Sequence, residues 1–210
     1  MQEAVPILYS DDAVAVCVKP AGLDSQTVLP AAVARRLGGE AFCVHRLDRD
    51  VGGVMLCART RQAAAVLSRE IADGLLEKEY LAVCAGRPSP ESGELRDLLF
   101  HDAGKNKTFV VKRMRRGVKE AALRYAVLAS DESKSLVRVR LLTGRSHQIR
   151  VQFASRGMPL LGDRKYGGAP LPGGPALWSA ALAFPHPDTG ETMRFSVPAP
   201  MAAPWTDFDH

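Results

Sequence analysis

Two stretches in the second half of the chain place an apolar residue at every second position. They cover residues 123–127 and 137–141, with polar or small residues in between. A period of two is typical of half-buried antiparallel strands. A doubly wound parallel sheet needs evenly alternating strands and helices, and the sequence lacks that alternation. We therefore predict an α/β chain of the α+β type, with a mixed, largely antiparallel sheet flanked by helices.

Helices and buried strands are expected on both sides of these stretches. Thr60 can cap a helix that carries an apolar face and has Gly74 near its end. Ser146 can cap a second helix with Ile149 and Phe153 on one face. Continuous β-branched and apolar runs predict buried strands over residues 13–19, 53–59 and 79–85.

Composition fits an ordinary globular protein of this length. The chain has 210 residues, of which 46% are hydrophobic and 24% charged. No apolar run approaches the roughly 20 residues that span a bilayer, and no secretory signal is expected, so no membrane association is predicted. Because no repeat or low-complexity linker divides the chain, we predict a single domain over residues 1–210.

The four cysteines, Cys17, Cys43, Cys57 and Cys84, form no CxxC pair and have no histidine at zinc-like spacing. Three of them stand in apolar, strand-like runs. We interpret them as small buried side chains in a reducing compartment, with a redox or metal role as the alternative. The cytoplasm is the expected location, and no metal is expected.

Positive charge is concentrated in one part of the chain. Residues 105–165 hold sixteen Lys or Arg and four Asp or Glu, whereas residues 1–60 hold six and seven. The run 105–119 contains seven basic residues and no acidic residue. This concentration favours a polyanion such as RNA or DNA as partner, with a merely solvated face as the alternative. A membrane surface fits less well, because the run lacks an apolar face at helical spacing.

A dense polar string, His45-Arg46-Leu47-Asp48-Arg49-Asp50, lies directly between two apolar segments. Aspartate has a reference pKa of about 3.9, so at neutral pH it can attack carbon or take a proton without an activating base. Burial would raise that pKa, and a nearby arginine would restore the charged form. From spacing alone, a structural ion pair is the competing interpretation of Asp48. No phosphate-binding loop and no GxSxG elbow is present.

A second string, Gly144-Arg145-Ser146-His147-Gln148-Ile149-Arg150, spans the start of the later expected helix. On a helix, His147 and Arg150 lie three positions apart and share a face. The string can start a phosphate-binding helix or supply an arginine that pairs with a carboxylate. Tyr80 is a third candidate, although an aromatic ring that fills the core is the simpler interpretation of it alone.

Five segments, in the same order along the chain, resemble the RluA-type RNA pseudouridine synthases. The string at residues 45–48 looks like the HRLD signature of that family. The other four are residues 16–23, similar to its opening strand and KPAGL turn, residues 78–82, similar to KxYxA, residues 144–163, similar to GRTHQIRVH and its continuation, and residues 182–191, similar to LxFxHPxTGE. Together these segments span residues 16–191.

The resemblance implies a pseudouridine synthase fold with an active-site cleft across the sheet. It implies an isomerase that converts specific uridines in structured rRNA or tRNA to pseudouridine. Asp48 would be the catalytic carboxylate, and Arg150 would keep it ionised, with Arg145 as the alternative. Tyr80 would lie against the uracil, and Arg46 would fill the space that the flipped nucleotide leaves. No metal, nucleotide or other cofactor is implied, and a monomer is expected.

Further substrate contacts are expected around these residues. Side chains that would bind the RNA within the two strings are His45, Arg145, His147 and Ile149. Side chains of the basic run that would hold phosphates are Lys112, Arg113, Arg115 and Arg116. The chain departs from the family pattern at several places, including Gln152, but none of these replaces the carboxylate, the arginine or the tyrosine. No separate N-terminal RNA-binding domain is expected, because the motifs begin within the first twenty residues.

Two other classes of function stay open from the sequence. One is a non-catalytic RNA-binding module, against which the joint presence of Asp48, Tyr80 and Arg150 argues. The other is a metal-free hydrolase that uses Asp48 and His147. A hydrolase would release free base or a cleaved product, whereas an isomerase leaves the mass of the RNA unchanged.

Overall fold

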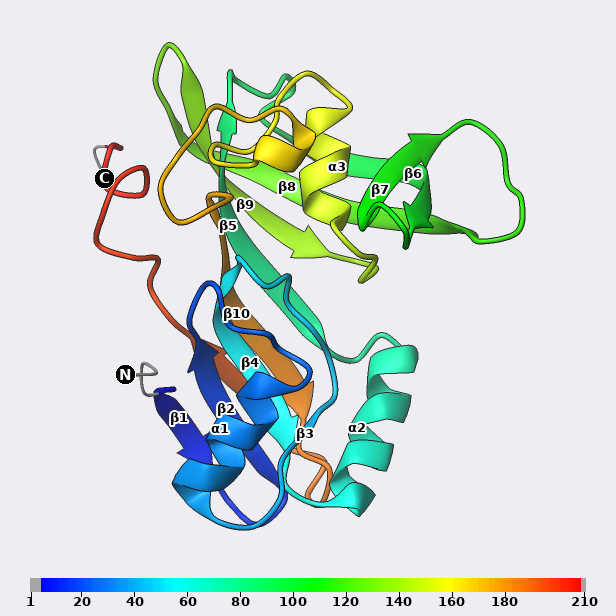
Figure 1. Ribbon diagram of the computed structural model, residues 1–210, viewed down its shortest axis with the longest axis vertical. Helices are drawn as coiled ribbons and strands as arrows, with labels where there is room; N and C mark the ends of the chain where they lie inside the picture. The colour runs from blue at the N-terminus through cyan, green and yellow to red at the C-terminus, as the bar shows by residue number, and fades with distance from the viewer. Residues whose placement is uncertain (1–4, 209–210) are drawn as a thin grey trace. The chain divides into compact units, whose positions relative to one another are not determined.

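This computed structural model describes residues 5–208, which fall into two compact units (Figure 1). The first unit comprises residues 5–78 and 179–198, and the second comprises residues 79–178 and 199–208. No helix in this described part of the chain is long and apolar enough to cross a membrane. The single domain over residues 1–210 stays a prediction, and its first four and last two residues lie outside the described range.

The first unit is built on a sheet with the strand order β1-β2-β4-β10. These strands are β1 (Ile7–Ser10), β2 (Val14–Lys19), β4 (Gly52–Ala58) and β10 (Leu177–Pro185), with β3 (Phe42–Cys43) paired to β4 and β11 (Thr192–Ser196) paired to β10. The pairs β1–β2, β2–β4, β3–β4 and β10–β11 are antiparallel. The unit also contains the helices α1 (Val28–Leu37) and α2 (Arg61–Ala72).

Helix α2 begins as the sequence predicts. The Thr60 hydroxyl accepts a hydrogen bond from the Ala63 amide at 3.0 Å, which satisfies one of the free amides at the helix start. Ala63 and Leu67 are buried in a core that they share with Leu56 and Phe184. Strand β4 is buried at all seven positions, in agreement with the continuous apolar run.

The second unit is built on a sheet with the strand order β5-β9-β8-β6-β7. These strands are β5 (Glu77–Ala85), β6 (Ser92–Asp102), β7 (Lys107–Val111), β8 (Val118–Ser130) and β9 (Lys134–Leu141). Strand β8 pairs antiparallel with both β6 and β9, so that Tyr125 lies opposite Gly93 and Val139. The two strands predicted from the period-two stretches are therefore confirmed, and so is the α+β class with a mostly antiparallel sheet.

Helix α3 (Gln148–Ala154) and the short 3-10 helix η1 (Arg164–Tyr166) complete the second unit. The Phe153 ring packs edge-on against Tyr125, with 5.8 Å between centroids. The predicted cap of α3 is wrong. His147, rather than Ser146, directly precedes the helix, in a left-handed conformation and without a capping side chain. The Ser146 carbonyl accepts a hydrogen bond from the Thr108 hydroxyl at 2.8 Å.

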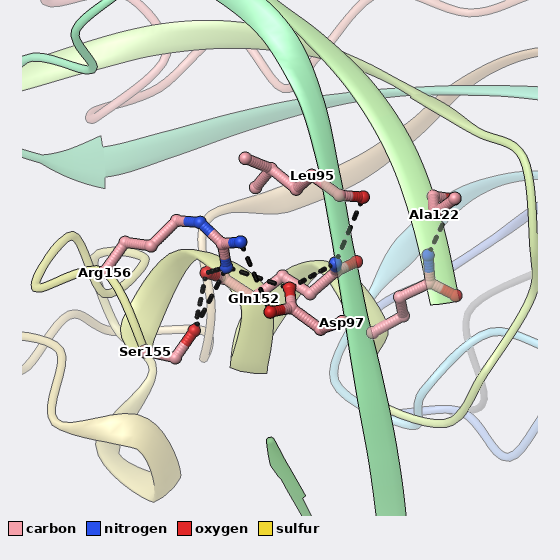
Figure 2. Close-up of polar contacts among 7 residues, drawn as sticks. Leu95, Asp97, Ala122, Gln152, Ser155 and Arg156 are labelled. Carbon is pink, nitrogen blue, oxygen red and sulfur yellow. Dashed lines mark hydrogen bonds and ion pairs between the residues drawn. The ribbon is translucent and has the colours of Figure 1, made fainter. Parts of the chain in front are cut away.

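Buried amides anchor α3 to the sheet of the second unit. The Gln148 Nε2 donates to the Ala122 carbonyl on β8 at 3.0 Å. One turn later, the Gln152 Nε2 donates to Asp97 Oδ2 on β6 at 2.7 Å, and Arg156 Nη1 donates to the same oxygen at 2.9 Å (Figure 2). Two of these anchors, Gln148 and Gln152, lie on the same side of the helix. They therefore fix both the position and the rotation of α3.

Candidate active site

Asp48 lies in the loop between β3 and β4, which the sequence singles out by its polar string. The Asp48 side chain is half-buried, whereas Arg46 and Asp50 on either side are exposed. Leu47 is buried and fastens the loop to the first unit. The Val51 amide donates to the Asp48 carbonyl at 3.0 Å and closes a turn. The loop thus presents a carboxylate from a fixed backbone position.

Lys19, at the end of β2, is fully buried and forms a hydrogen bond with the backbone of this loop. Its ammonium donates hydrogen bonds to the carbonyls of Pro20, Leu23 and Arg49 at 2.8, 2.8 and 2.9 Å. Burial lowers the pKa of Lys19 to about 8, although nearby aspartates, Asp48 among them, favour the charged form. Three carbonyls around one ammonium satisfy all of its donors, so Lys19 ties the turn after β2 to the loop of Asp48.

Two further sets of contacts tie the same segments together. The Gly22 amide donates to the Arg49 carbonyl at 2.8 Å, and Arg49 Nε donates back to the Gly22 carbonyl at 3.0 Å. The Ser25 hydroxyl donates to the Leu47 carbonyl at 2.8 Å. The backbone on each side of Asp48 is therefore hydrogen-bonded to residues 22–25. Residues 16–23 resemble the opening strand and turn of the family, but that resemblance does not indicate that the turn supports Asp48.

His45, predicted to bind substrate, contacts the protein backbone. The Leu56 amide on β4 donates to His45 Nε2 at 3.0 Å, which requires an unprotonated Nε2. Burial lowers the pKa of His45 to about 3, and the positive charge of Lys78 lowers it further. The ring is therefore neutral, with its proton on Nδ1, and Nδ1 is buried without a hydrogen-bond partner among the described residues. A contact of His45 with RNA stays a prediction.

The low pKa of His45 predicts that the protein loses stability in mild acid. The folded-state pKa is about 3 and the reference value is 6.5, so between these values the unfolded chain binds more protons at this position. The free energy of unfolding should fall with decreasing pH below 6.5, by up to about 1.4 kcal/mol per pH unit from this residue. In His45→Asn the slope should be smaller by one proton. Urea unfolding across this pH range measures it, and equal slopes would contradict the assignment.

Arg150 is held in the second unit by a buried carboxylate. Its Nε donates to Asp163 Oδ2 at 2.7 Å, and one Nη donates to Asp163 Oδ1 at 2.8 Å. Both side chains are almost entirely buried. The guanidinium carbon also lies 5.3 Å from the centroid of the Tyr166 ring. The sequence alone did not predict this bidentate ion pair between Arg150 and Asp163, although Asp163 belongs to the segment that resembles the family.

His147 and Arg145 lie at the start of α3 in different surroundings. His147 is buried, with a φ of 53°, and its Nδ1 is hydrogen-bonded to the Tyr166 hydroxyl at 2.9 Å. Arg145 is exposed, and its Nε donates to the Glu120 carbonyl at 2.9 Å. His147 lies immediately before α3 rather than on the helix, yet His147 and Arg150 both contact Tyr166. The Tyr166 hydroxyl fixes the imidazole.

The remaining candidates of the second unit divide into buried and exposed groups. Tyr80, on β5, and Ile149, on α3, are each about 5% exposed or less. The four basic candidates lie on the loop between β7 and β8 and are all exposed: Lys112, Arg113, Arg115 and Arg116. One of them, Arg115, places its guanidinium carbon 5.0 Å from the Phe100 ring centroid. Placement on a loop leaves these side chains accessible to a polyanion.

The four cysteines are free thiols in the structure. Cys17, Cys57 and Cys84 are buried, as the sequence predicts, and Cys43 is half-buried. The Sγ atoms of Cys43 and Cys57 lie 3.9 Å apart on the paired strands β3 and β4. A hydrogen bond with the Cys17 thiol, together with burial, raises the pKa of Cys57 above its ordinary range, although the contact with Cys43 lowers it, and the net shift disfavours the reactive thiolate. Over residues 5–208, no group of three or more His, Cys, Asp or Glu is arranged to hold a metal ion.

Residues 13–155 match the sequence profile of the RNA pseudouridylate synthases. The chain belongs to this family. It is 35% identical over 95% of its length to the uncharacterized RNA pseudouridine synthase YjbO of Bacillus subtilis, of which it covers 75%. It is 33% identical over 92% of its length to the ribosomal large subunit pseudouridine synthase D of Haemophilus influenzae, of which it covers 67%. The resemblance drawn from the five sequence segments is confirmed, and the protein is an RNA pseudouridine synthase.

Solved structures show the same fold. Human RNA pseudouridylate synthase domain containing 1 superposes with a TM-score of 0.81 at 23% identity, covering 95% of this chain and 85% of the human chain. Human RNA pseudouridylate synthase domain containing 4 gives a TM-score of 0.78 at 24% identity, covering 93% and 89%. At these identities the likeness concerns the fold.

Proposed function

We propose that this synthase modifies specific uridines in structured ribosomal or transfer RNA, with Asp48 as its catalytic carboxylate. The observation that carries the proposal is a carboxylate on a loop that Lys19 fixes from a buried position, in a chain of this family. Relatives named for the large ribosomal subunit favour ribosomal RNA as the substrate. The enzyme acts as a monomer in the cytoplasm and needs no metal or nucleotide cofactor.

The reaction is an isomerisation of the uridine. The N1–C1′ bond breaks, the uracil turns, C5 bonds to C1′, and the C5 proton leaves while N1 gains one. Asp48 attacks the sugar or the base, or removes a sugar proton, and each route requires an ionised carboxylate. Arg150 favours that ionised form, with Arg145 as the alternative partner. Tyr80 lies against the uracil and takes part in the transfer of the C5 proton.

Arg46 takes the place of the flipped nucleotide. Extrusion of a stacked base costs about a few kcal/mol before chemistry starts, and a planar guanidinium can stack and hydrogen-bond in the space left behind. The exposed Arg46 side chain, two residues before Asp48, supports this role. His45, His147 and Ile149 complete the proposed contacts with the substrate.

Arg46→Ala should slow modification more on structured RNA than on unstructured RNA. In an unstructured RNA of the same local sequence, little stacking is lost when the base leaves, so the guanidinium has less to replace. Single-turnover rates at saturating enzyme measure both substrates without a contribution from weaker binding. Equal slowing on the two would assign Arg46 to the support of Asp48 and would end the proposed flipping role.

The basic loop between β7 and β8 holds the phosphate backbone. Replacing Lys112, Arg113, Arg115 and Arg116 by Ala should weaken RNA binding and reduce its dependence on salt. Each lost phosphate contact should lower the slope of log affinity against log salt by about 0.7–0.9. Replacing the exposed Arg61 and Arg69 of α2 serves as the control and should leave the slope unchanged. An unchanged slope in the loop variant would show that these residues form only a solvated face.

Mapping pseudouridine in RNA from cells with and without the gene tests the substrate. Sites that depend on this protein should appear in ribosomal RNA, and sites in transfer RNA instead would move the proposal to that class. If no site in either class depends on the gene, the proposed substrate is wrong. Re-expression of the wild-type protein should restore each site.

A further inference from the structure

The turn around η1 places two side chains on Arg150. Asp163, just before η1, forms the two-pronged ion pair, and Tyr166, at its end, presents its ring to the same guanidinium. In a 3-10 helix, side chains three positions apart are eclipsed. One short turn therefore contacts the guanidinium through both a carboxylate and an aromatic face.

The backbone of this turn is closely packed. A Cβ on Gly162 would lie 1.9 Å from the Gly174 carbonyl oxygen, and a Cβ on Gly168 would lie 2.0 Å from the Leu160 carbonyl oxygen. Between these glycines, the amides of Tyr166 and Gly168 both donate to the Asp163 carbonyl, at 3.0 and 2.9 Å. The turn has little freedom to move, so Asp163 and Tyr166 are fixed with respect to the rest of the second unit.

The Tyr166 hydroxyl extends the contacts to His147 and β7. It accepts a hydrogen bond from the Thr108 amide at 2.8 Å and is bonded to His147 Nδ1 at 2.9 Å. Burial raises the pKa of Tyr166, so the phenol stays protonated. The Thr108 hydroxyl in turn donates to the Ser146 carbonyl, just before α3. Tyr166 thus contacts two residues to which the proposed function gives a role: Arg150, the proposed partner of Asp48, through its ring, and His147, a proposed substrate contact, through its hydroxyl.

We propose that Asp163 and Tyr166 are positioning residues of the pseudouridine synthase reaction, which together hold the Arg150 guanidinium in one orientation while Tyr166 also holds the His147 ring. This inference rests on the proposed catalytic role of Arg150. An arginine side chain has many rotamers, and the pair of contacts selects one of them before substrate arrives. A misplacement of about 1 Å in a catalytic group can cost about a hundredfold in rate.

The second unit offers a matched control for Asp163. Asp97 also forms an ion pair with an arginine next to α3, Arg156, but it lies on β6 and contacts Gln152 rather than Arg150 (Figure 2). Asp163→Asn and Asp97→Asn each remove one negative charge and keep the shape of the side chain. If these pairs only stabilise the packing of α3, both variants should lose stability and rate together.

Single-turnover rates at saturating enzyme, RNA dissociation constants and urea unfolding are measured for both variants. Asp163→Asn should lower the rate at saturation by about a hundredfold, with a dissociation constant within about threefold of the wild type. Asp97→Asn should lose stability but keep its rate within about threefold. In an Arg150→Lys background, Asp163→Asn should slow the reaction by less than it does alone, because it acts through Arg150.

Two Tyr166 variants test the aromatic contact and remain informative if Asp163→Asn does not fold. Tyr166→Phe keeps the ring on Arg150 and loses the hydroxyl, whereas Tyr166→Leu loses both. The Leu variant should lower the rate at saturation by about tenfold, and the Phe variant should recover most of that loss. Equal rates for the wild type and the Leu variant would overturn the role of Tyr166.

The outcomes separate this inference from the proposed function. A rate for Asp163→Asn within threefold of the wild type, or equal slowing by Asp97→Asn, would overturn the positioning role while leaving Arg150 in place. If Arg150→Lys itself keeps the wild-type rate, the catalytic role of Arg150 is wrong and the positioning role falls with it. Slowing by Arg150→Lys and Asp163→Asn, without slowing by Asp97→Asn, supports both.

Discussion

Asp48→Asn is expected to abolish pseudouridine formation while the fold and the affinity for RNA are kept. The substitution preserves the shape of the side chain but removes the negative charge, so that neither attack on carbon nor removal of a proton remains possible. The loop should keep its conformation, because Lys19 and Ser25 bind the carbonyls of Arg49 and Leu47 rather than the Asp48 side chain. Repulsion between a carboxylate and RNA disappears, so binding should not weaken. Single-turnover formation of pseudouridine measures the effect.

Asp50→Asn is the matched control. Asp50 lies two residues further on in the same loop and is exposed, so its substitution changes the net charge equally. It should keep most of the wild-type rate. Turnover by Asp48→Asn above about a tenth of the wild-type rate would contradict the assignment of Asp48, since loss of a nucleophile or base costs far more than tenfold.

Gly53→Ala is expected to cause the largest loss of stability of any single methyl addition in the first unit. Gly53, on β4, has a φ of 120°, and a Cβ there would lie 2.2 Å from the Ser179 carbonyl oxygen and 2.6 Å from its nitrogen. Both obstacles are backbone atoms of β10, which cannot turn away as a side chain could. The added methyl should lower the free energy of unfolding by about 4 kcal/mol or more, because it combines overpacking with backbone strain. Urea unfolding measures the loss.

Gly74→Ala separates the two causes. Gly74, after α2 in the same unit, has a φ of 79° and nothing within 4 Å of the added Cβ. This variant should lose only the cost of the left-handed conformation, about 1 kcal/mol. A Gly53→Ala protein as stable as Gly74→Ala would show that β10 can move away from β4 at this position.

Local patterns in the sequence predict much of the fold. The period-two stretches around Leu123 and Val139 become β8 and β9, and Thr60 caps α2 as its position before the helix suggests. The cap at Ser146 is wrong because His147, in a left-handed conformation, is the residue that directly precedes the helix. The backbone before it is held by a hydrogen bond from the Thr108 hydroxyl to the Ser146 carbonyl. A hydrogen bond between residues 38 positions apart leaves no local pattern to read.

The sequence predicts those residues of the candidate site that stand together in a short polar string. The string around Asp48 indicates a reactive carboxylate, and the resemblance to the family adds Arg150 and Tyr80. The contacts of Lys19 with three carbonyls and of Asp163 with Arg150 arise only in the folded chain. A lysine that ends a buried strand was the one available signal for the first, since a buried ammonium needs partners. For Asp163 the signal was its place in the segment 144–163 that resembles the family, which does not indicate its pairing with Arg150.

Release of tritium from RNA labelled at C5 of uridine tests the central claim most directly. Isomerisation removes the C5 hydrogen and keeps the uracil on the same nucleotide, so the wild-type enzyme should release tritium into water while the RNA chain stays intact and no free uracil forms. Asp48→Asn should release none above background. Free uracil, a cleaved strand, or tritium release by Asp48→Asn above about a tenth of the wild-type rate would contradict an isomerase that works through Asp48.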